Sequence, residues 1–295
     1  MTYLVGYSPH KSDQGAVDLA CLLALSDDQP VHVLSVVPAG WGTPAVGDTD
    51  RDFQLWAQGE GAEAEAEARA ELAAHPSVTS DASWVPGRSV PQAILDEAER
   101  LTASMLVVGS GASTRHGTIS LTSKTDRLLH SSPLPVAIAP KGYAVSPGSR
   151  VARVTVAFRG DHTTSALLER VAEICQRTKA RLRIVTFAIN ARRMVTTTVP
   201  DAEGAIVAQW VRQASADQQL ALDNLAELGM DPAAVEHVVA VGRSWGGAID
   251  QLDWGKGDVL VLGSSMSSSL MARVFLGSSA TKIIANSPVP VIVVP

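Results

Sequence analysis

Residues 258–295 read DVLVLGSSMSSSLMARVFLGSSATKIIANSPVPVIVVP, and this stretch decides the fold. It opens with a short apolar run, Val259 to Leu262, which is typical of a strand covered on both faces. A loop rich in Gly and Ser follows, then a helix predicted over Ala280 to Ala285 and a second apolar run, Val289 to Val294. This order predicts an α/β crossover. Because small residues lead into the positive end of a helix dipole, the loop could hold a phosphate.

The same pattern occurs once more, between Met105 and Pro140, as MLVVGSGASTRHGTISLTSKTDRLLHSSPLPVAIAP. The matching landmarks are Gly109 with Gly263, Leu121-Thr122-Ser123 with Leu276-Gly277-Ser278, Ser132-Pro133-Leu134-Pro135 with Ser287-Pro288-Val289-Pro290, and Gly87-Arg88-Ser89 with Gly242-Arg243-Ser244. A repeat with a period of about half the chain indicates two copies of one domain, because a solenoid would repeat every few tens of residues.

Both halves alternate predicted strands with predicted helices. In the first half the strands are Tyr3–Tyr7, Val31–Val37, Ser80–Val85, Met105–Val108 and Val136–Ala139, and the helices are Asp13–Ala24 (with Ser12 as its cap), Asp52–Ala74, Pro91–Leu101 and Lys124–His130. In the second half the strands are Arg153–Phe158, Leu182–Ala188, Glu236–Val241, Val259–Leu262 and Val289–Val294, and the helices are Ser165–Arg177, Ala205–Leu228, Gly246–Leu252 and Ala280–Ala285. This order predicts the class α/β, with two tandem Rossmann-like domains. Each is expected to be a five-stranded, mostly parallel sheet with helices on both faces.

Composition and charge narrow the function classes. The length of 295 residues fits two domains, and the segment from Lys141 to Arg150 has the composition of a linker, so the domains are predicted over residues 1–143 and 150–295. A formal net charge of −6 argues against a general nucleic-acid or membrane-surface binder. No signal peptide or membrane span is visible, which favours the cytoplasm. Cys21 and Cys175 lie in apolar helical contexts, which indicates buried thiols.

On these residues the chain resembles the universal stress protein family, in the tandem two-domain form common in actinobacteria. The motifs are VGY or VAF at the start of each half, GRS, VVGS or VLGS, RVFLGSSATKI and SPVPVIVVP. The resemblance implies a Rossmann-like domain and a dimeric contact in which the last strands of two domains meet. In a tandem chain the two halves can make this contact themselves, and a further homodimer is an additional expectation. Val136 to Ala139 and Val289 to Val294 would be apolar edge strands that need covering.

ATP-binding members of that family carry a loop written G-x-x-G-x9-G-[ST] and an acidic residue after the first strand, and this chain departs from both. The loop positions read Gly109, Ala112, Thr122 and Ser123 in the first half, and Gly263, Met266, Gly277, Ser278 and Ser279 in the second. The acidic residue is replaced by Ser8 in one half and by Arg159 in the other, with Asp161 two residues later. Met266 adds a bulky side chain where glycine lets backbone approach a phosphate. Arg159 could instead pair with an anion.

The resemblance implies contacts for ATP or another adenine nucleotide, and the departures make binding weaker in the first half. The implied contacts are Gly263, Ser264, Gly277, Ser278 and Ser279 in the second half, and Gly109, Ser110, Thr122 and Ser123 in the first. The alternative interpretation of Gly263 to Ser279, a tight turn and a helix cap without a ligand, stays open.

The histidine and serine patterns favour neither a metal site nor nucleophilic catalysis. The seven histidines form no metal-type cluster, and the segments VVGSG and VLGSS are interpreted as the start of the small-residue loop and not as a nucleophile elbow. Arg88 and Arg243 recur at the same place in both halves, which indicates turn residues that bond carbonyls; an anion contact is the functional alternative. The prediction is a binding or regulatory module that is not an enzyme. The competing hypotheses are a nucleotide-free scaffold for protein–protein contact and, on fold-level resemblance alone, an enzyme of the related adenine-nucleotide α/β hydrolase group.

Overall fold

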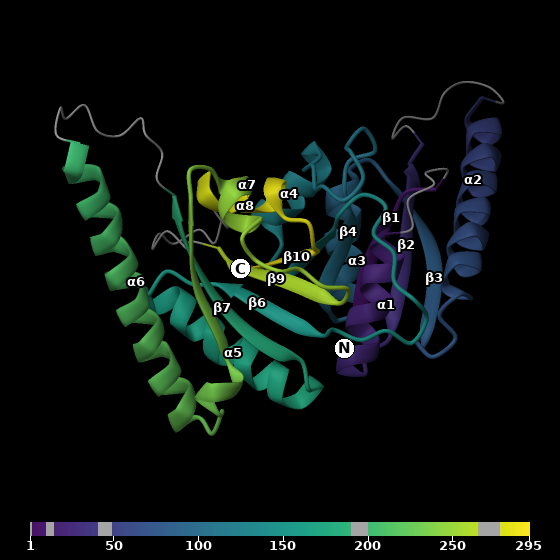
Figure 1. The fold of residues 1–295 in the computed structure, drawn as a ribbon. Helices are drawn as coiled ribbons and strands as arrows, with labels where there is room; N and C mark the ends of the chain where they lie inside the picture. The colour runs from purple at the N-terminus through teal and green to yellow at the C-terminus, as the bar shows by residue number, and fades with distance from the viewer. Residues whose placement is uncertain (1, 10–14, 41–48, 190–199, 265–277) are drawn as a thin grey trace. The chain divides into compact units, whose positions relative to one another are not determined.

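The chain folds into two compact units, Met1–Arg150 (unit 1) and Val151–Pro295 (unit 2). The computed structural model describes residues 2–9, 15–40, 49–189, 200–264 and 278–295 (Figure 1). Ser12, the predicted cap of the first helix, lies outside these ranges. In the described ranges no helix combines the length and the apolar character needed to span a membrane.

Unit 1 is a parallel sheet with helices on both faces. Its strands are β1 (Thr2–Tyr7), β2 (Val31–Pro38), β3 (Ser80–Gly87), β4 (Ala103–Gly109) and β5 (Val136–Ala139), and its helices are α1 (Gly15–Asp27), α2 (Thr49–Leu72), α3 (Val90–Arg100) and α4 (Ser123–Ser131). The strand order is β3-β2-β1-β4-β5, and every neighbouring pair is parallel. The order reverses between β1 and β4, and such a switch point opens a crevice outside the carboxyl ends of the strands.

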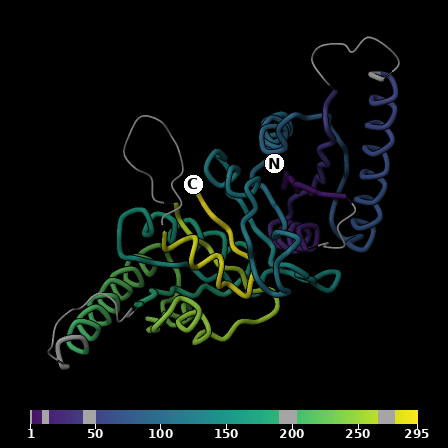
Figure 2. Tube along the Cα trace, turned by 90° about the horizontal axis from the view of Figure 1, so that it is seen from above, coloured from purple at the N-terminus to yellow at the C-terminus, as the bar shows by residue number. Residues whose placement is uncertain are grey.

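Alternate residues of β1 contact different helices, which defines the layers of unit 1. The Tyr3 hydroxyl donates to Asp27 Oδ2 in α1 at 3.0 Å, and the Tyr7 hydroxyl donates to Glu71 Oε1 in α2 at 2.7 Å. Gly6, whose side-chain direction is opposite, faces Ile94 of α3. Figure 2 shows α1 in purple and α3 in blue on opposite sides of the strands of this unit.

Unit 2 repeats this topology. Its strands are β6 (Arg153–Ala157), β7 (Arg181–Ile189), β8 (Glu236–Gly242), β9 (Asp258–Gly263) and β10 (Val291–Val294), and its helices are α5 (His162–Thr178), α6 (Pro200–Glu227), the 3-10 turn η1 (Pro232–Ala234), α7 (Trp245–Ile249) and α8 (Ser278–Asn286). The order β10-β9-β6-β7-β8 is again all parallel. Thr186 of β7 accepts a hydrogen bond from Gln218 of α6, whereas the adjacent Val185 packs with Ala248 of α7. The predicted fold class is therefore confirmed.

The last strand of unit 2 begins later than the sequence predicts. The apolar run starts at Val289, but β10 starts at Val291. The Ser287 hydroxyl accepts from the Val289 N–H at 3.3 Å and donates to the Val289 carbonyl at 2.8 Å. The next residue, Pro290, has no N–H to donate. The first two residues of the run are therefore held in a turn, although the Pro290 carbonyl still accepts from the Leu260 N–H of β9 at 2.9 Å.

The core of unit 2 contains a buried charge network that the sequence analysis missed. Arg183 is fully buried, and Arg153 and Asp258 are nearly so. Arg153 donates to Asp258 Oδ2 through Nη2 at 2.6 Å, and Arg183 donates through Nε to Thr155 Oγ1 at 3.0 Å. The Arg183 guanidinium lies 4.5 Å from the ring centroid of Trp254. Burial and the neighbouring charge of Arg153 lower the pKa of Arg183 below its ordinary value.

Candidate functional site

A cleft of about 240 Å³ lies in unit 1, at the carboxyl ends of β1, β2 and β4 and the start of α4. Apolar residues of the strands and of α3 form its inner wall, namely Gly6, Leu34, Val36, Val90, Ile94 and Val108. Its other wall is polar and includes Ser8, Ser110, Ser123 and Lys124. All the predicted contacts of the first half, Gly109, Ser110, Thr122 and Ser123, line this cleft. The tertiary structure therefore brings them together.

The N-terminus of α4 opens into the cleft, with Thr122 as its cap. Thr122 Oγ1 accepts a hydrogen bond from the Thr125 N–H at 3.1 Å, and the Thr122 carbonyl accepts from the Asp126 N–H at 2.8 Å. Threonine is a favoured cap residue, so the replacement of the motif glycine by Thr122 preserves the helix start. The N–H groups of Ser123 and Lys124 have no protein partner in the described part of the chain. Free N–H groups in a first turn are suited to an anion.

The loop that follows β4 is closed by its own hydrogen bonds. The Ser120 N–H donates to Ser110 Oγ at 2.8 Å, and the Gly111 N–H donates to the Ser120 carbonyl at 3.0 Å. Lys141 bonds to the loop at Gly117 and Thr118 through its backbone. The Ser110 hydroxyl therefore shapes the loop, and it keeps its own proton for donation to a ligand.

The glycines of the cleft leave space that a side chain would fill. A Cβ added to Gly6 would lie 3.0 Å from Ile94 Cδ1, and a Cβ added to Gly111 would lie 3.3 Å from Thr122 Cγ2. Both distances are shorter than ordinary van der Waals contacts. The residues present thus fit a flat apolar group at the inner wall and an anionic group at α4.

Unit 2 has larger residues at the equivalent positions. Counting from the aligned strand starts VGY and VAF, Ala157 replaces Gly6 and Leu167 replaces Ala16. A Cβ added to Gly263 would lie 3.2 Å from Leu167 Cδ2, whereas the corresponding distance from Gly109 to Ala16 Cβ is 3.8 Å. Leu167 therefore packs more tightly against the end of β9 than Ala16 packs against Gly109, and both of these unit 1 residues line the cleft. Gly6 and Ala16 were not predicted as site residues, although a position-by-position comparison of the two halves identifies them.

Arg159 and Asp161, which replace the acidic residue of the motif in unit 2, pair with each other. Arg159 Nη2 lies 2.9 Å from Asp161 Oδ2, and Asp161 caps α5 by accepting from the Thr164 N–H at 2.8 Å. Although burial acts in the opposite direction, the hydrogen bonds from Thr164 and the charge of Arg159 hold the pKa of Asp161 below its ordinary value. Asp161 is thus used as a helix cap, and the Arg159 guanidinium already has an anionic partner.

The other predicted contacts of unit 2 are only partly described. Gly263 ends β9, Ser278 and Ser279 begin α8, and both serines are exposed. Ser264 donates its N–H to the Val294 carbonyl at 2.8 Å, and its buried hydroxyl has no partner among the described residues. Gly277 and Met266 lie outside the described residues.

The remaining single residues that the sequence singled out show no contact with one another in a shared site among the described residues. The ring of His116 lies against Gly142, where an added Cβ would be 2.1 Å from His116 Nδ1. Cys21 and Cys175 are buried free thiols, as predicted. For Arg88, no bond to a carbonyl is seen in the described part of the chain, so the interpretation as a carbonyl-bonding turn residue receives no support. Among the described residues, no group of His, Cys, Asp and Glu side chains is arranged to hold a metal ion.

Comparison with known proteins agrees with the fold and with the repeat. The sequence profile described as "Universal stress protein family" matches residues 1–140 and again residues 151–295. The chain is 34% identical over 297 residues to "Universal stress protein Rv2319c" of Mycobacterium tuberculosis (strain ATCC 25618 / H37Rv), and equally to "Universal stress protein Mb2346c" of Mycobacterium bovis, with full coverage of each chain.

Solved structures share the fold over the whole chain. The crystal structure of a universal stress protein from Archaeoglobus fulgidus DSM 4304 matches with a TM-score of 0.60 and 18% identity, covering 99% of this chain and 97% of that one. The functionally unknown protein PA1789 from Pseudomonas aeruginosa PAO1 matches with a TM-score of 0.56 and 17% identity, covering 99% and 91%. The double profile match and the full-length relatives together establish that this chain belongs to the universal stress protein family.

Proposed function

We propose that unit 1 binds an adenine nucleotide and that the protein acts through this binding as a regulatory module. The observation that carries the proposal is the cleft of about 240 Å³ that joins an apolar wall to the first turn of α4. A purine base is flat and largely apolar on its faces, which suits Leu34, Val36 and Val108. A phosphate is suited to the free N–H groups of Ser123 and Lys124.

The residues that line the cleft favour binding without turnover. Among the described residues that line the cleft there is no Asp, Glu or His side chain. A general base must lie within hydrogen-bond reach of the proton that it removes. Tyr7 also lines the cleft, but its hydroxyl donates to Glu71, and burial together with this hydrogen bond raises the pKa of the phenol well above its ordinary value. It therefore stays protonated at neutral pH, and any hydrolysis of a bound nucleotide is expected to be slow.

Three features support unit 1 over unit 2 as the binding unit. Leu167 lies where unit 1 has the small Ala16, and Ala157 lies where unit 1 has Gly6. The Arg159 side chain is engaged with Asp161. This assignment reverses the expectation from the loop motif, in which the second half looked better suited to nucleotide.

The proposal is tested first on protein purified without added ligand. The protein is denatured, and the supernatant is examined for adenine absorbance and by chromatography. Stripped protein is then titrated with AMP and with ATP in a calorimeter. The variant Ala16→Leu introduces the side chain that unit 2 carries, and we expect it to weaken binding at least tenfold, because the leucine fills the cleft beside Gly109.

A matched control separates closure of the cleft from damage to the fold. Ala70 is an exposed residue of α2, and Ala70→Leu adds the same side chain away from the cleft. We expect this variant to bind as the parent does. Loss of binding in both variants, or normal binding in Ala16→Leu, would contradict the assignment of the site to this cleft.

The alternative function is a nucleotide-free scaffold for contact with another protein. It is favoured by the exposed apolar side chains Leu55 and Trp56 of α2, which are 58% and 48% exposed. A protein that releases no nucleotide and shows no shift in thermal stability at millimolar ATP would support the scaffold. The predicted contact between the last strands, β5 and β10, stays a prediction; each of these strands is an edge strand of its own unit.

A further inference from the structure

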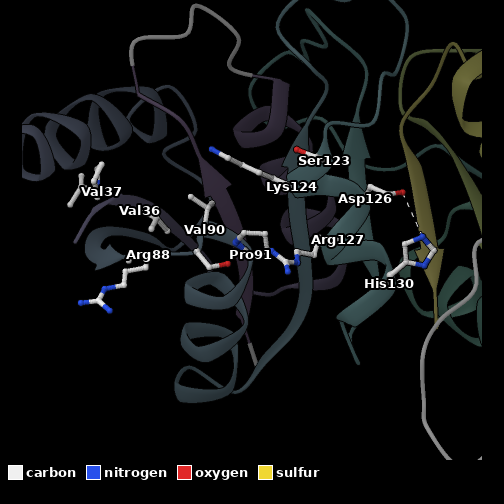
Figure 3. Close-up of a pocket in the computed structure, with 13 residues that line it drawn as sticks. Val36, Val37, Arg88, Val90, Pro91, Ser123, Lys124, Asp126, Arg127 and His130 are labelled. Carbon is white, nitrogen blue, oxygen red and sulfur yellow. Dashed lines mark ion pairs between the residues drawn. The ribbon is translucent and has the colours of Figure 1, made fainter. Parts of the chain in front are cut away.

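A second and larger groove of about 860 Å³ lies beside the cleft, between the start of α3 and the length of α4 (Figure 3). Its apolar part consists of Val36, Val37, Pro38, Val90 and Pro91. Its charged wall is one face of α4, and Arg88 lines it from the turn before α3. The sequence offered an anion contact as the alternative role of Arg88, but the groove itself was not predicted.

Among the described residues, the cations of the groove have no carboxylate partner, unlike Arg69 and Arg100 of the same unit. Arg69 lies 2.8 Å from Asp81, and Arg100 lies 2.5 Å from Glu97. For Lys124, Arg127 and Arg88, no ion pair is seen in the described part of the chain, although the chain as a whole is acidic. Cationic side chains without a partner on a concave surface attract an anionic ligand.

One carboxylate also lines the groove. Asp126 belongs to the charged wall, and its Oδ1 lies 3.6 Å from His130 Nε2 on the next turn of α4 (Figure 3). Asp126 is exposed and faces solvent on the same helix as the cations. An anion in the groove would therefore be repelled by Asp126 and attracted by its neighbours Lys124 and Arg127.

The groove is continuous with the cleft. Val36, Val90, Ser123 and Lys124 line both cavities. From Lys124 to His130 the wall follows α4 for about 9 Å, at the rise of an α-helix. An anionic chain that starts at the first turn of α4 can therefore continue along this wall past Arg127.

We propose that the groove binds the outer phosphates of a nucleoside polyphosphate, so that Lys124 and Arg127 make unit 1 select nucleotides by the length of the phosphate chain. This inference rests on the proposed function, since the cleft must first bind the nucleoside end. The cleft binds the base and the phosphate nearest to the ribose, and the groove binds the phosphates that follow.

The test measures the affinity of stripped protein for AMP, ADP, ATP and adenosine tetraphosphate at low salt and without divalent cations. Affinity is expected to rise from AMP to adenosine tetraphosphate, and to rise less at high salt, because exposed charges are screened. Lys124→Met and Arg127→Met should each weaken the affinity for ATP by about threefold to tenfold. Arg127→Met should leave the affinity for AMP nearly unchanged. Asp126→Asn should have the opposite effect and raise the affinity for ATP.

A matched control is available in unit 2. Lys282 is exposed and occupies the position in α8 that Arg127 occupies in α4, and Lys282→Met should leave all the affinities unchanged. Equal affinity for AMP and ATP, or equal losses in the Lys282 and Arg127 variants, would overturn the inference and leave the proposed function standing. Failure of every adenine nucleotide to bind would overturn both.

Discussion

Leu167 of α5 packs against Gly263 at the end of β9, where a Cβ on the glycine would lie 3.2 Å from Leu167 Cδ2. In unit 1 the same relationship joins Ala16 to Gly109 at 3.8 Å. One copy of the repeat thus covers the end of its fourth strand with a leucine, and the other leaves a cleft there. The two copies share a topology and differ in a few side chains at the strand ends, which is where ligands bind in this class of fold.

Leu167 should contribute to the stability of unit 2 and should not affect nucleotide binding. Leu167 is 7% exposed, so Leu167→Ala is expected to destabilise unit 2 by roughly 2 to 5 kcal/mol through lost burial and a residual cavity. Denaturant unfolding checks this, with the unit 2 transition followed separately because two units need not unfold in one step. Nucleotide affinity should stay at the parent value. A variant that loses affinity would place the binding site in unit 2.

The stability of α5 should depend on the cap hydrogen bond that Asp161 accepts more than on the charge of its carboxylate. Asp161→Ala removes the acceptor for the Thr164 N–H, and we expect a loss of about 1 kcal/mol in the free energy of unfolding. Asp161→Asn keeps a cap oxygen and loses the ion pair with the exposed Arg159, which contributes little. The asparagine variant should therefore be nearly as stable as the parent in urea unfolding. If the two variants are equally destabilised, the carboxylate has a role beyond the cap.

The buried charge network of unit 2 should tolerate removal of the pair better than removal of one partner. Asp258→Asn leaves Arg153 buried without its closest carboxylate, and we expect unit 2 to lose about 3 kcal/mol. The double variant Arg153→Met with Asp258→Leu removes both charges and should be less destabilised than the sum of the single changes. Chemical denaturation of the single and double variants tests this. Additive losses would mean that the pair does not act as a unit.

The two cysteines should be inert while the protein is folded. Burial raises the pKa of the Cys175 thiol to about 12, and burial together with the charge of Asp18 raises that of Cys21 to about 12. At pH 8 only about one thiol in ten thousand is then a thiolate, which is the reactive form. A thiol reagent at pH 8 should modify neither residue in native protein, and both in denaturant. Rapid modification of the native protein would contradict the burial of these side chains.

Much of the architecture could be predicted because the pattern of apolar residues is local. The alternation of strands and helices, the repeat, and the fold class all follow from periodicity and from the recurring landmarks, and these are confirmed. The start of β10 was predicted at Val289 and lies at Val291, because the Val289 N–H donates to the Ser287 hydroxyl and the start of the apolar run is held in a turn. Arg153, Arg183 and Asp258 gave no signal, because three charged residues at strand starts resemble solvated ends until the strands are placed side by side.

The sequence by itself determined the two copies, the class of fold, the family resemblance and four residues that line the cleft, Gly109, Ser110, Thr122 and Ser123. Each of these depends on residues that are near one another in the chain. Only the tertiary structure decided which copy has room for a ligand and which cations surround it. Lys124 of α4 is far along the chain from Gly6 of β1 and Ala16 of α1, and the volume between these three residues is set by packing. The local pattern of apolar residues does not reveal a difference of a few methyl groups, such as Ala16 in unit 1 against Leu167 in unit 2. In the folded units this difference separates an open cleft from a filled one.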